Sequence, residues 1–146
     1  MIKWHTYLLL LMLFFIVFAL IFSVIYLFAN GFGIGMEAEN TFVFESLSPD
    51  GNLKAVVFER NAGATTDFST QLSILRSNEA YSGDAGNALI ADSDHGKSPI
   101  ASWGGPEIRV KWQATNKLLI EHHIRARIFR AEPKIENVQI EYKTFF

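Results

Sequence analysis

YLLLLMLFFIVFALIFSVIYLF, residues 7–28, is a run of 22 residues without a charged side chain, and the interpretation of the remaining chain depends on it. A helix rises about 1.5 Å per residue, so this run would reach roughly 33 Å, enough to cross a hydrocarbon core of about 30 Å. Its 17 Leu, Ile, Phe and Val residues favour insertion into a bilayer. The sequence therefore predicts one transmembrane helix over residues 7–28.

The charges that flank this run predict its orientation. Lys3 precedes it, and the first Lys or Arg that follows is Lys54. Basic residues next to a span favour the cytoplasmic side. We therefore expect a cytoplasmic tail over residues 1–6, a membrane-proximal linker over 29–40 and an extracytoplasmic domain over 41–146.

A cleaved signal peptide is the alternative, since it also has a basic start and an apolar core. Its apolar region usually runs about 7 to 15 residues and ends at a small-x-small site. Here the run is longer, and the candidate sites that end at Ala29 and Ala38 fit poorly. The pattern favours a retained signal-anchor. The chain contains no cysteine, which excludes disulfides and a lipid-modified cysteine.

The composition of the remaining residues predicts one small domain. About 110 residues follow the anchor and its glycine-rich exit, too few for two domains. Residues 37–107 carry 11 acidic and 4 basic side chains, whereas residues 108–146 carry 4 acidic and 8 basic ones. Charge blocks of this size are typical of solvated faces, so we expect no nucleic-acid partner.

Alternating hydrophobicity predicts β-structure from Thr41 onward. Ser48-Pro49-Asp50-Gly51 is a turn sequence, and the strand pattern LKAVVFER follows at residues 53–60. Phe42 and Phe44 are expected on one face, and the polar segment 77–87 is expected to be a surface loop. No amphipathic helix is indicated between residues 40 and 146. The pattern predicts a mainly β domain of six to eight strands, mostly antiparallel, in a sandwich or an open barrel.

The longest alternating run, residues 118–129, supplies a first candidate binding surface. As one strand it would place His123, Arg125 and Arg127 on one face, with Leu118 and Ile124 on the other. The guanidinium groups could bind an anion such as a lipid phosphate or an acidic partner surface. The alternative is a solvent-facing strand whose charges keep a sheet soluble.

The loop RNAGATTDFS, residues 60–69, supplies a second candidate surface. Its small residues allow a backbone or a ligand to approach closely, and its threonines offer hydroxyl groups without bulk. Arg60, Gly63, Thr65 and Thr66 are therefore candidate partner-binding residues. The alternative is an ordinary wide connection between two strands.

Catalytic and metal-binding patterns are weak. Asp92, Asp94 and His95 could join His122 or His123 around a metal, but their spacing matches no ligand signature. There is no Gly-x-Ser-x-Gly elbow and no thiol. We predict no catalytic residue, no metal and no cofactor, and hence a protein that is not an enzyme.

Three segments together carry a family resemblance. SPDGNLKAVVFER, NAGATTDFSTQLSIL and IRVKWQATNKLLIEH resemble a family of small bacterial proteins with a domain of unknown function, often preceded by one membrane span. The similarity covers most of residues 46–142, and the Gly-Ala-Thr-Thr loop is its most specific part. The resemblance implies a bacterial source and the inner membrane as location, and it implies no activity. With the orientation that the flanking charges predict, the domain would be periplasmic or extracellular.

Together these features predict a membrane-anchored binding domain with a protein partner at the cell envelope. An immunity-type role is one form of this hypothesis. The alternatives are an accessory subunit of an envelope complex and, third, an envelope hydrolase. The sequence leaves the oligomeric state open.

Overall fold

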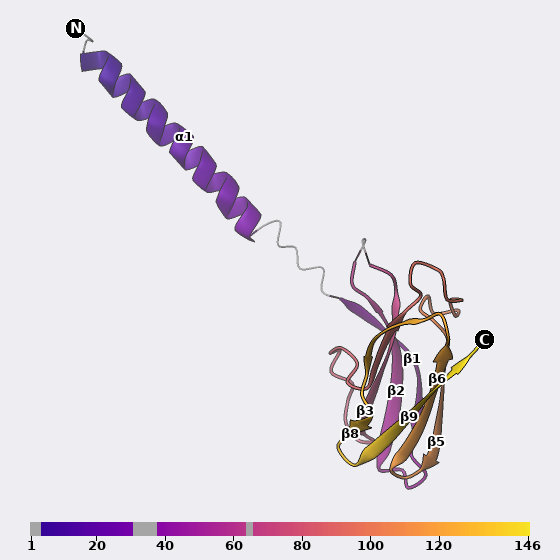
Figure 1. Ribbon diagram of the computed structural model, residues 1–146. Helices are drawn as coiled ribbons and strands as arrows, with labels where there is room; N and C mark the ends of the chain where they lie inside the picture. The colour runs from indigo at the N-terminus through magenta and orange to yellow at the C-terminus, as the bar shows by residue number, and fades with distance from the viewer. Residues whose placement is uncertain (1–3, 31–37, 64–65) are drawn as a thin grey trace. The chain divides into compact units, whose positions relative to one another are not determined.

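The computed structural model describes residues 4–30, 38–63 and 66–146 (Figure 1). The chain divides into two units, Met1–Met36 and Glu37–Phe146. The first unit contains the helix α1, Trp4–Asn30, and the second contains the described strands.

Helix α1 confirms the predicted apolar helix and extends it by a few residues at each end. Every side chain from Trp4 to Leu27 is exposed, and the most apolar 18-residue window of this stretch has a mean hydropathy of 3.3. A helix at the surface of a globular protein normally turns one apolar stripe toward a core. Apolar all round and exposed throughout, α1 is long and apolar enough to cross a membrane.

The second unit is a β-sandwich of two sheets, which decides the alternative that the sequence left open (Figure 1). One sheet has the order β1-β2-β3-β4-β7 and the other the order β5-β6-β9-β8. All strand pairs are antiparallel except β6 with β9. The nine strands found in the described residues are β1 Glu39–Leu47, β2 Leu53–Asn61, β3 Ser69–Arg76, β4 Leu89–Asp92, β5 Ile108–Ala114, β6 Lys117–His123, β7 Arg127–Ala131, β8 Lys134–Ile135 and β9 Val138–Phe145.

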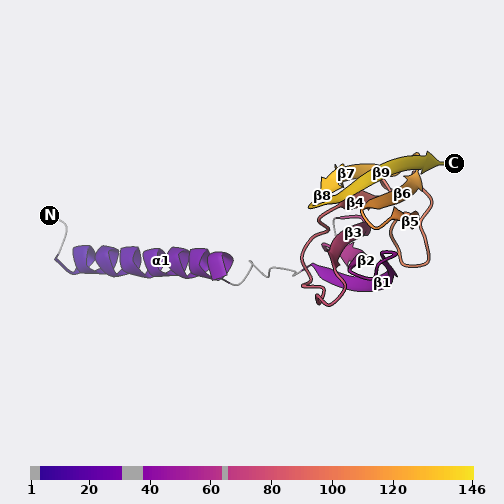
Figure 2. The same ribbon diagram turned by 90° about the horizontal axis from the view of Figure 1, so that it is seen from below.

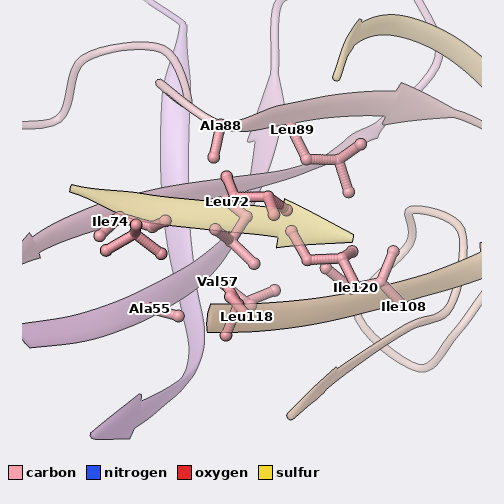
Figure 3. Packing of buried hydrophobic residues seen from close by; sticks show 11 residues of the cluster. Ala55, Val57, Leu72, Ile74, Ala88, Leu89, Ile108, Leu118 and Ile120 are labelled. Carbon is pink, nitrogen blue, oxygen red and sulfur yellow. The ribbon is translucent and has the colours of Figure 1, made fainter. Parts of the chain in front are cut away.

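The hydrophobic core lies between the two sheets. Figure 2, a view along the strands, shows β2 and β3 of one sheet facing β6 and β9 of the other. Val57 and Leu72 from one sheet meet Leu118 and Ile120 from the other, and all four are fully buried (Figure 3). The edges of the two sheets approach at β1 and β5, where the Trp112 indole donates a hydrogen bond to the carbonyl of Ser46 at 2.9 Å. This side-chain contact replaces a strand ladder, so the structure is not a closed barrel.

The loop 77–87 also covers the outer face of the first sheet, so it is more than the surface connection that the sequence predicts. The Tyr81 ring packs on Phe58 with a centroid distance of 4.5 Å, and Phe58 is fully buried. Burial raises the pKa of Tyr81 to about 12. Strand β2 is therefore buried on both faces, which explains its nearly continuous apolar sequence.

Two expectations about facing side chains are wrong. Phe42 and Phe44 do not share a face, because a β-bulge at Val43 shifts the register of β1; Phe42 is 58% exposed, whereas Phe44 packs against the core. The run 118–129 is not one strand. It is divided between β6 in one sheet and β7 in the other, with a turn over residues 124–126.

One end of the sandwich collects most of the predicted site residues. Strands β1, β3, β5 and β7 begin at this end, which we call the tether end because the chain enters the domain there; the opposite end is the far end. A row of paired residues locates the tether end. It crosses the first sheet close to the starts of β1, β3 and β7 and consists of Asn40, Arg60, Ser69, Asp92 and Arg127. The connections 93–107 and 124–126 and the described residues 62–63 and 66–68 lie at the tether end.

Candidate functional site

Two neighbouring depressions at the tether end contain most of the predicted residues that the structure describes. The first, the Arg127 depression, has a volume of about 240 Å³, and the second, the Arg125 depression, about 380 Å³. They share the turn that follows β4, since His95 lines the first and Gly96 and Lys97 line the second. A depression of about 510 Å³ at the far end contains none of the predicted residues.

The Arg127 depression joins two segments that the sequence singled out separately. It brings the loop 62–68 against the start of β7, so that Thr66 and Arg127 line one surface. Phe129 forms one wall, with its side chain 60% exposed and its ring 4.9 Å from the guanidinium carbon of Arg127. The lining residues are Ala62, Thr66, Asp67, Ser69, Ile90, Asp92, His95, Arg127 and Phe129.

Arg127 is the centre of an ion-pair network in this depression. Its Nε donates to Asp92 Oδ1 at 3.0 Å, its Nη2 donates to Asp92 Oδ2, and its Nη1 lies 3.5 Å from Asp94 Oδ1. The Asp92 side chain is only 6% exposed, whereas that of Arg127 is 40% exposed. The hydrogen bonds to Asp92 raise the pKa of Arg127. Because Asp92 accepts hydrogen bonds from both sides of the guanidinium fork, Arg127 is not available to bind an external anion in the same way.

The turn after β4 is fixed by carboxylates. Asp67 Oδ2 accepts the backbone N–H of His95 at 2.6 Å and the Ser93 hydroxyl at 3.2 Å, and chiefly the first of these bonds lowers the pKa of Asp67. The Lys97 ammonium donates to Asp94 Oδ2 at 2.7 Å and lowers the pKa of Asp94. Asp94 and His95 have positive φ angles of 50° and 58°. This left-handed backbone is rare for residues with a side chain, and the carboxylate contacts hold it in place.

The described residues of the loop 62–68 include a local turn at Gly63. Gly63 has a φ of 109°, a conformation that side chains rarely tolerate. Its N–H donates to Asn61 Oδ1 at 3.0 Å, and its carbonyl accepts the N–H of Thr66 at 3.1 Å and the Thr66 hydroxyl at 3.0 Å. Thr65 lies outside the described residues.

The Arg125 depression lies between the turn 124–126 and the turn after β4. His123 organises the first of these turns: its carbonyl accepts the N–H of Ala126 at 2.9 Å, and its Nδ1 accepts the N–H of Arg125 at 3.1 Å. Arg125 and Ile124 are exposed. The lining residues are Gly96, Lys97, Pro99, His123, Ile124, Arg125 and Phe146.

The predicted basic face is therefore divided. His123 and Arg125 line one depression, Arg127 lines the other, and the turn between β6 and β7 separates them. Arg109 on β5 adjoins His123 through a shared contact: the guanidinium carbon of Arg109 lies 4.1 Å from the centre of the Phe145 ring, and the His123 ring packs edge-on against the same ring.

Arg60 has a different role from the other predicted residues. Its Nη1 donates to Asn40 Oδ1 and to the carbonyl of Gly83, each at 3.2 Å. These bonds hold the loop 77–87 on the outer face of the sheet. Arg130 does the same from β7, donating to the carbonyl of Gly86 at 2.7 Å.

The structure does not bring the candidate metal ligands together. Within the described parts of the chain, no group of three or more His, Asp and Glu side chains is placed to hold a metal. His122 and His123 do not join Asp92, because their contacts are with β5, β9 and the turn 124–126. Glu59 is 8% exposed and its Oε1 has no hydrogen-bond partner; burial, and then the charge of Glu39, raise the pKa of Glu59.

Sequence reasoning missed Asp67 and Phe129 as parts of this site. Asp67 belongs to the loop that the sequence selected, but no local pattern shows that its carboxylate reaches residues 93 and 95. Phe129 ends a run that looked like one strand. The only sequence signal for the network was the Asp92-Ser93-Asp94-His95 turn, which had been considered for a metal.

Comparisons of the chain with protein-family models, with characterised proteins and with solved structures found no match. The resemblance to small membrane-anchored bacterial proteins therefore stays a prediction. The fold and the site define a β-sandwich that follows an apolar helix and carries two depressions at one end.

Proposed function

We propose that this chain is a single-pass membrane protein of the bacterial inner membrane, with its amino terminus inside and the β-sandwich outside, and that the sandwich binds a protein partner without catalysis. The observation that carries the proposal is α1, which is free of acidic and basic side chains other than His5 and exposed from Trp4 to Leu27. Water is a poor solvent for such a surface, and a bilayer is a good one.

Charge supports the orientation. Lys3 precedes α1, and no Lys or Arg follows before Lys54. The absence of cysteine is compatible with either side of the membrane, so the orientation rests on this asymmetry.

The Arg127 depression supports the binding role. Phe129 is a large exposed aromatic side chain beside a network that already fixes Arg127, Asp92 and Asp67. Aromatic anchors on rigid surroundings are the residues that most often dominate protein interfaces, because they lose little conformational freedom on binding. The carboxylates here are engaged in ion pairs and backbone contacts, which favours recognition over proton transfer.

Topology is tested first. In bacterial cells, a carboxy-terminal alkaline phosphatase fusion to the full chain is expected to be active, and the corresponding green fluorescent protein fusion is expected to be dark. The full-length protein should stay in the membrane pellet after carbonate extraction. A bright cytoplasmic fluorescent fusion, or a protein released by carbonate, would contradict the proposed membrane placement.

The binding surface is tested by a matched pair of substitutions. Phe129→Ala should reduce several-fold the recovery of proteins that cross-link to the full-length chain in membranes. Phe42→Ala is the control, because Phe42 is similarly exposed at 58% on the outer face of the same sheet. Equal recovery with both variants would exclude the Arg127 depression as the partner site.

A further inference from the structure

The exposed apolar side chains of the β-domain are unevenly distributed. Among its described residues, the large exposed apolar ones are Phe42, Leu47, Phe68, Ile100, Ile124, Phe129 and Phe146. Phe68, Ile100, Ile124 and Phe146 lie outside the strands, at the tether end. At the far end, Leu47 stands next to the turn 48–52. Loop positions usually carry polar residues, so apolar side chains gathered at one end indicate a surface that water does not cover in function.

The chain connection favours a bilayer as the covering surface, a step that rests on the proposed function. Residues 31–38 connect α1 to β1 and can extend over at most about 30 Å. If α1 spans the membrane, this short connection raises the local concentration of lipid at the tether end, as a linker does for any tethered ligand. The far end has no such connection.

The chemistry of the Arg125 depression fits the interface of a phospholipid bilayer. Ile124 is 46% exposed and lines the depression together with Lys97 and Arg125. Ile100 is 63% exposed and directly follows Pro99, another lining residue. Lys97 pairs with Asp94, whereas the Arg125 guanidinium makes no ion pair with any described residue. Apolar side chains can enter the boundary between headgroups and acyl chains while guanidinium and ammonium groups reach phosphate oxygens.

We propose that the connections 96–100 and 123–126 dock on the headgroup region of the bilayer that holds α1. Ile100 and Ile124 enter the interface, and Arg125 binds the phosphate of an anionic lipid. Docking of this end turns the outer face of the first sheet, and with it the Arg127 depression, to the side of the domain, where a protein partner can approach parallel to the membrane.

The cysteine-free chain allows a direct test with single labels. Full-length Ile124→Cys is labelled with an environment-sensitive fluorophore and reconstituted into vesicles of phosphatidylcholine, with or without phosphatidylglycerol. Leu47→Cys is the matched control at the far end, since Leu47 is 56% exposed. Spin-labelled lipid should quench the Ile124 label several-fold more strongly than the Leu47 label. Ile100→Cys gives an independent second position.

Neutralising single arginine side chains provides a second test of the docking proposal. Arg125→Gln should lower the docked-to-undocked ratio about fivefold in vesicles with phosphatidylglycerol, because one basic side chain near an anionic surface contributes on this scale. Arg76→Gln, at an exposed far-end position, should leave the ratio unchanged. Equal effects of the two substitutions would overturn the assignment of Arg125.

A label in α1 separates failure of the docking proposal from failure of the membrane placement. Phe18→Cys should be quenched by lipid in every vesicle type; if it is not, the proposed function fails. If Phe18 is quenched and the labels at Ile100 and Ile124 behave like Leu47, docking on lipid is overturned. Shielding of those two labels without quenching by lipid would point to a protein covering the surface, and it would overturn the proposal as well.

Discussion

Arg127→Met tests whether the Arg127 depression is held by its ion pair. The substitution keeps an apolar stem against Phe129 but removes the guanidinium, leaving the Asp92 carboxylate with a side chain only 6% exposed and without its charged partner. Breaking a buried pair costs about 3 to 5 kcal/mol. Because Arg127 itself is 40% exposed and water can enter the vacated space, we expect a loss of about 2 to 3 kcal/mol.

Urea denaturation of the full-length protein in a mild detergent measures this loss. Trp103 and Trp112 report on the sandwich, since their indole nitrogens donate to Thr70 Oγ1 and to the carbonyl of Ser46, each at 2.9 Å. With an m-value of about 1.5 kcal/mol per molar urea, the midpoint should fall by roughly 1 to 2 M.

Arg109→Met is the matched control for Arg127→Met. Arg109 and its partner Glu107 are 56% and 47% exposed, so their pair should contribute under about 0.5 kcal/mol. Asp92→Asn in the Arg127→Met background should recover about 1 kcal/mol or more, because it removes the stranded charge. If Arg127→Met costs no more than Arg109→Met, then Asp92 does not depend on Arg127 and the rigid network proposed here is refuted.

Three further predictions concern the packing of the sandwich. Gly105→Ala should cost at least about 2 kcal/mol of unfolding free energy, because a Cβ at residue 105 would stand 2.8 Å from the backbone nitrogen of Thr70; an unchanged urea midpoint would contradict this. Tyr81→Ala should cost about 3 kcal/mol, since it uncovers Phe58, whereas Tyr81→Phe keeps the ring and should cost under about 1 kcal/mol. Glu59 has a raised pKa in the folded state, so its ionisation lowers the free energy of unfolding as pH rises through that pKa. The free energy of unfolding of Glu59→Gln should equal that of the wild type below about pH 4 and exceed it near neutrality. Parallel pH profiles of the two proteins would show that Glu59 is solvated.

Much of the fold could be predicted because the signals are local. The uncharged run at residues 7–28 specifies an apolar helix whatever surrounds it, and the structure extends that helix only to Trp4 and Asn30. Alternation and the Ser48-Pro49-Asp50-Gly51 turn specified β1, β2 and the hairpin between them. The turn is closed by the Gly51 N–H donating to the carbonyl of Ser48 at 2.9 Å, a contact that its own residues determine.

Which layer of the fold a segment joins is not a local property of its sequence, and the sequence did not predict it correctly. The loop 77–87 has a polar composition, yet Tyr81 and the contacts to Arg60 and Arg130 fold it onto a sheet. Whether a loop finds such partners depends on residues up to 44 positions away, such as Arg130 for Gly86. The bulge at Val43 is a second example. One extra residue places Phe42 and Phe44 on opposite faces of the sheet, although the alternation in the sequence looks intact.

The run at residues 118–129, which the structure divides between two sheets, links a wrong prediction to a functional hypothesis. Alternation records which side of the local backbone a residue occupies, but it cannot show that the chain has left one sheet and joined another. For this reason the alternation places Ile124 on the same face as Leu118. In the structure Leu118 is fully buried, whereas Ile124 is 46% exposed on the turn beside Arg125. A side chain that matches the core pattern but lies outside the core needs another apolar surface to cover it, and a bilayer tethered to the same domain would provide one.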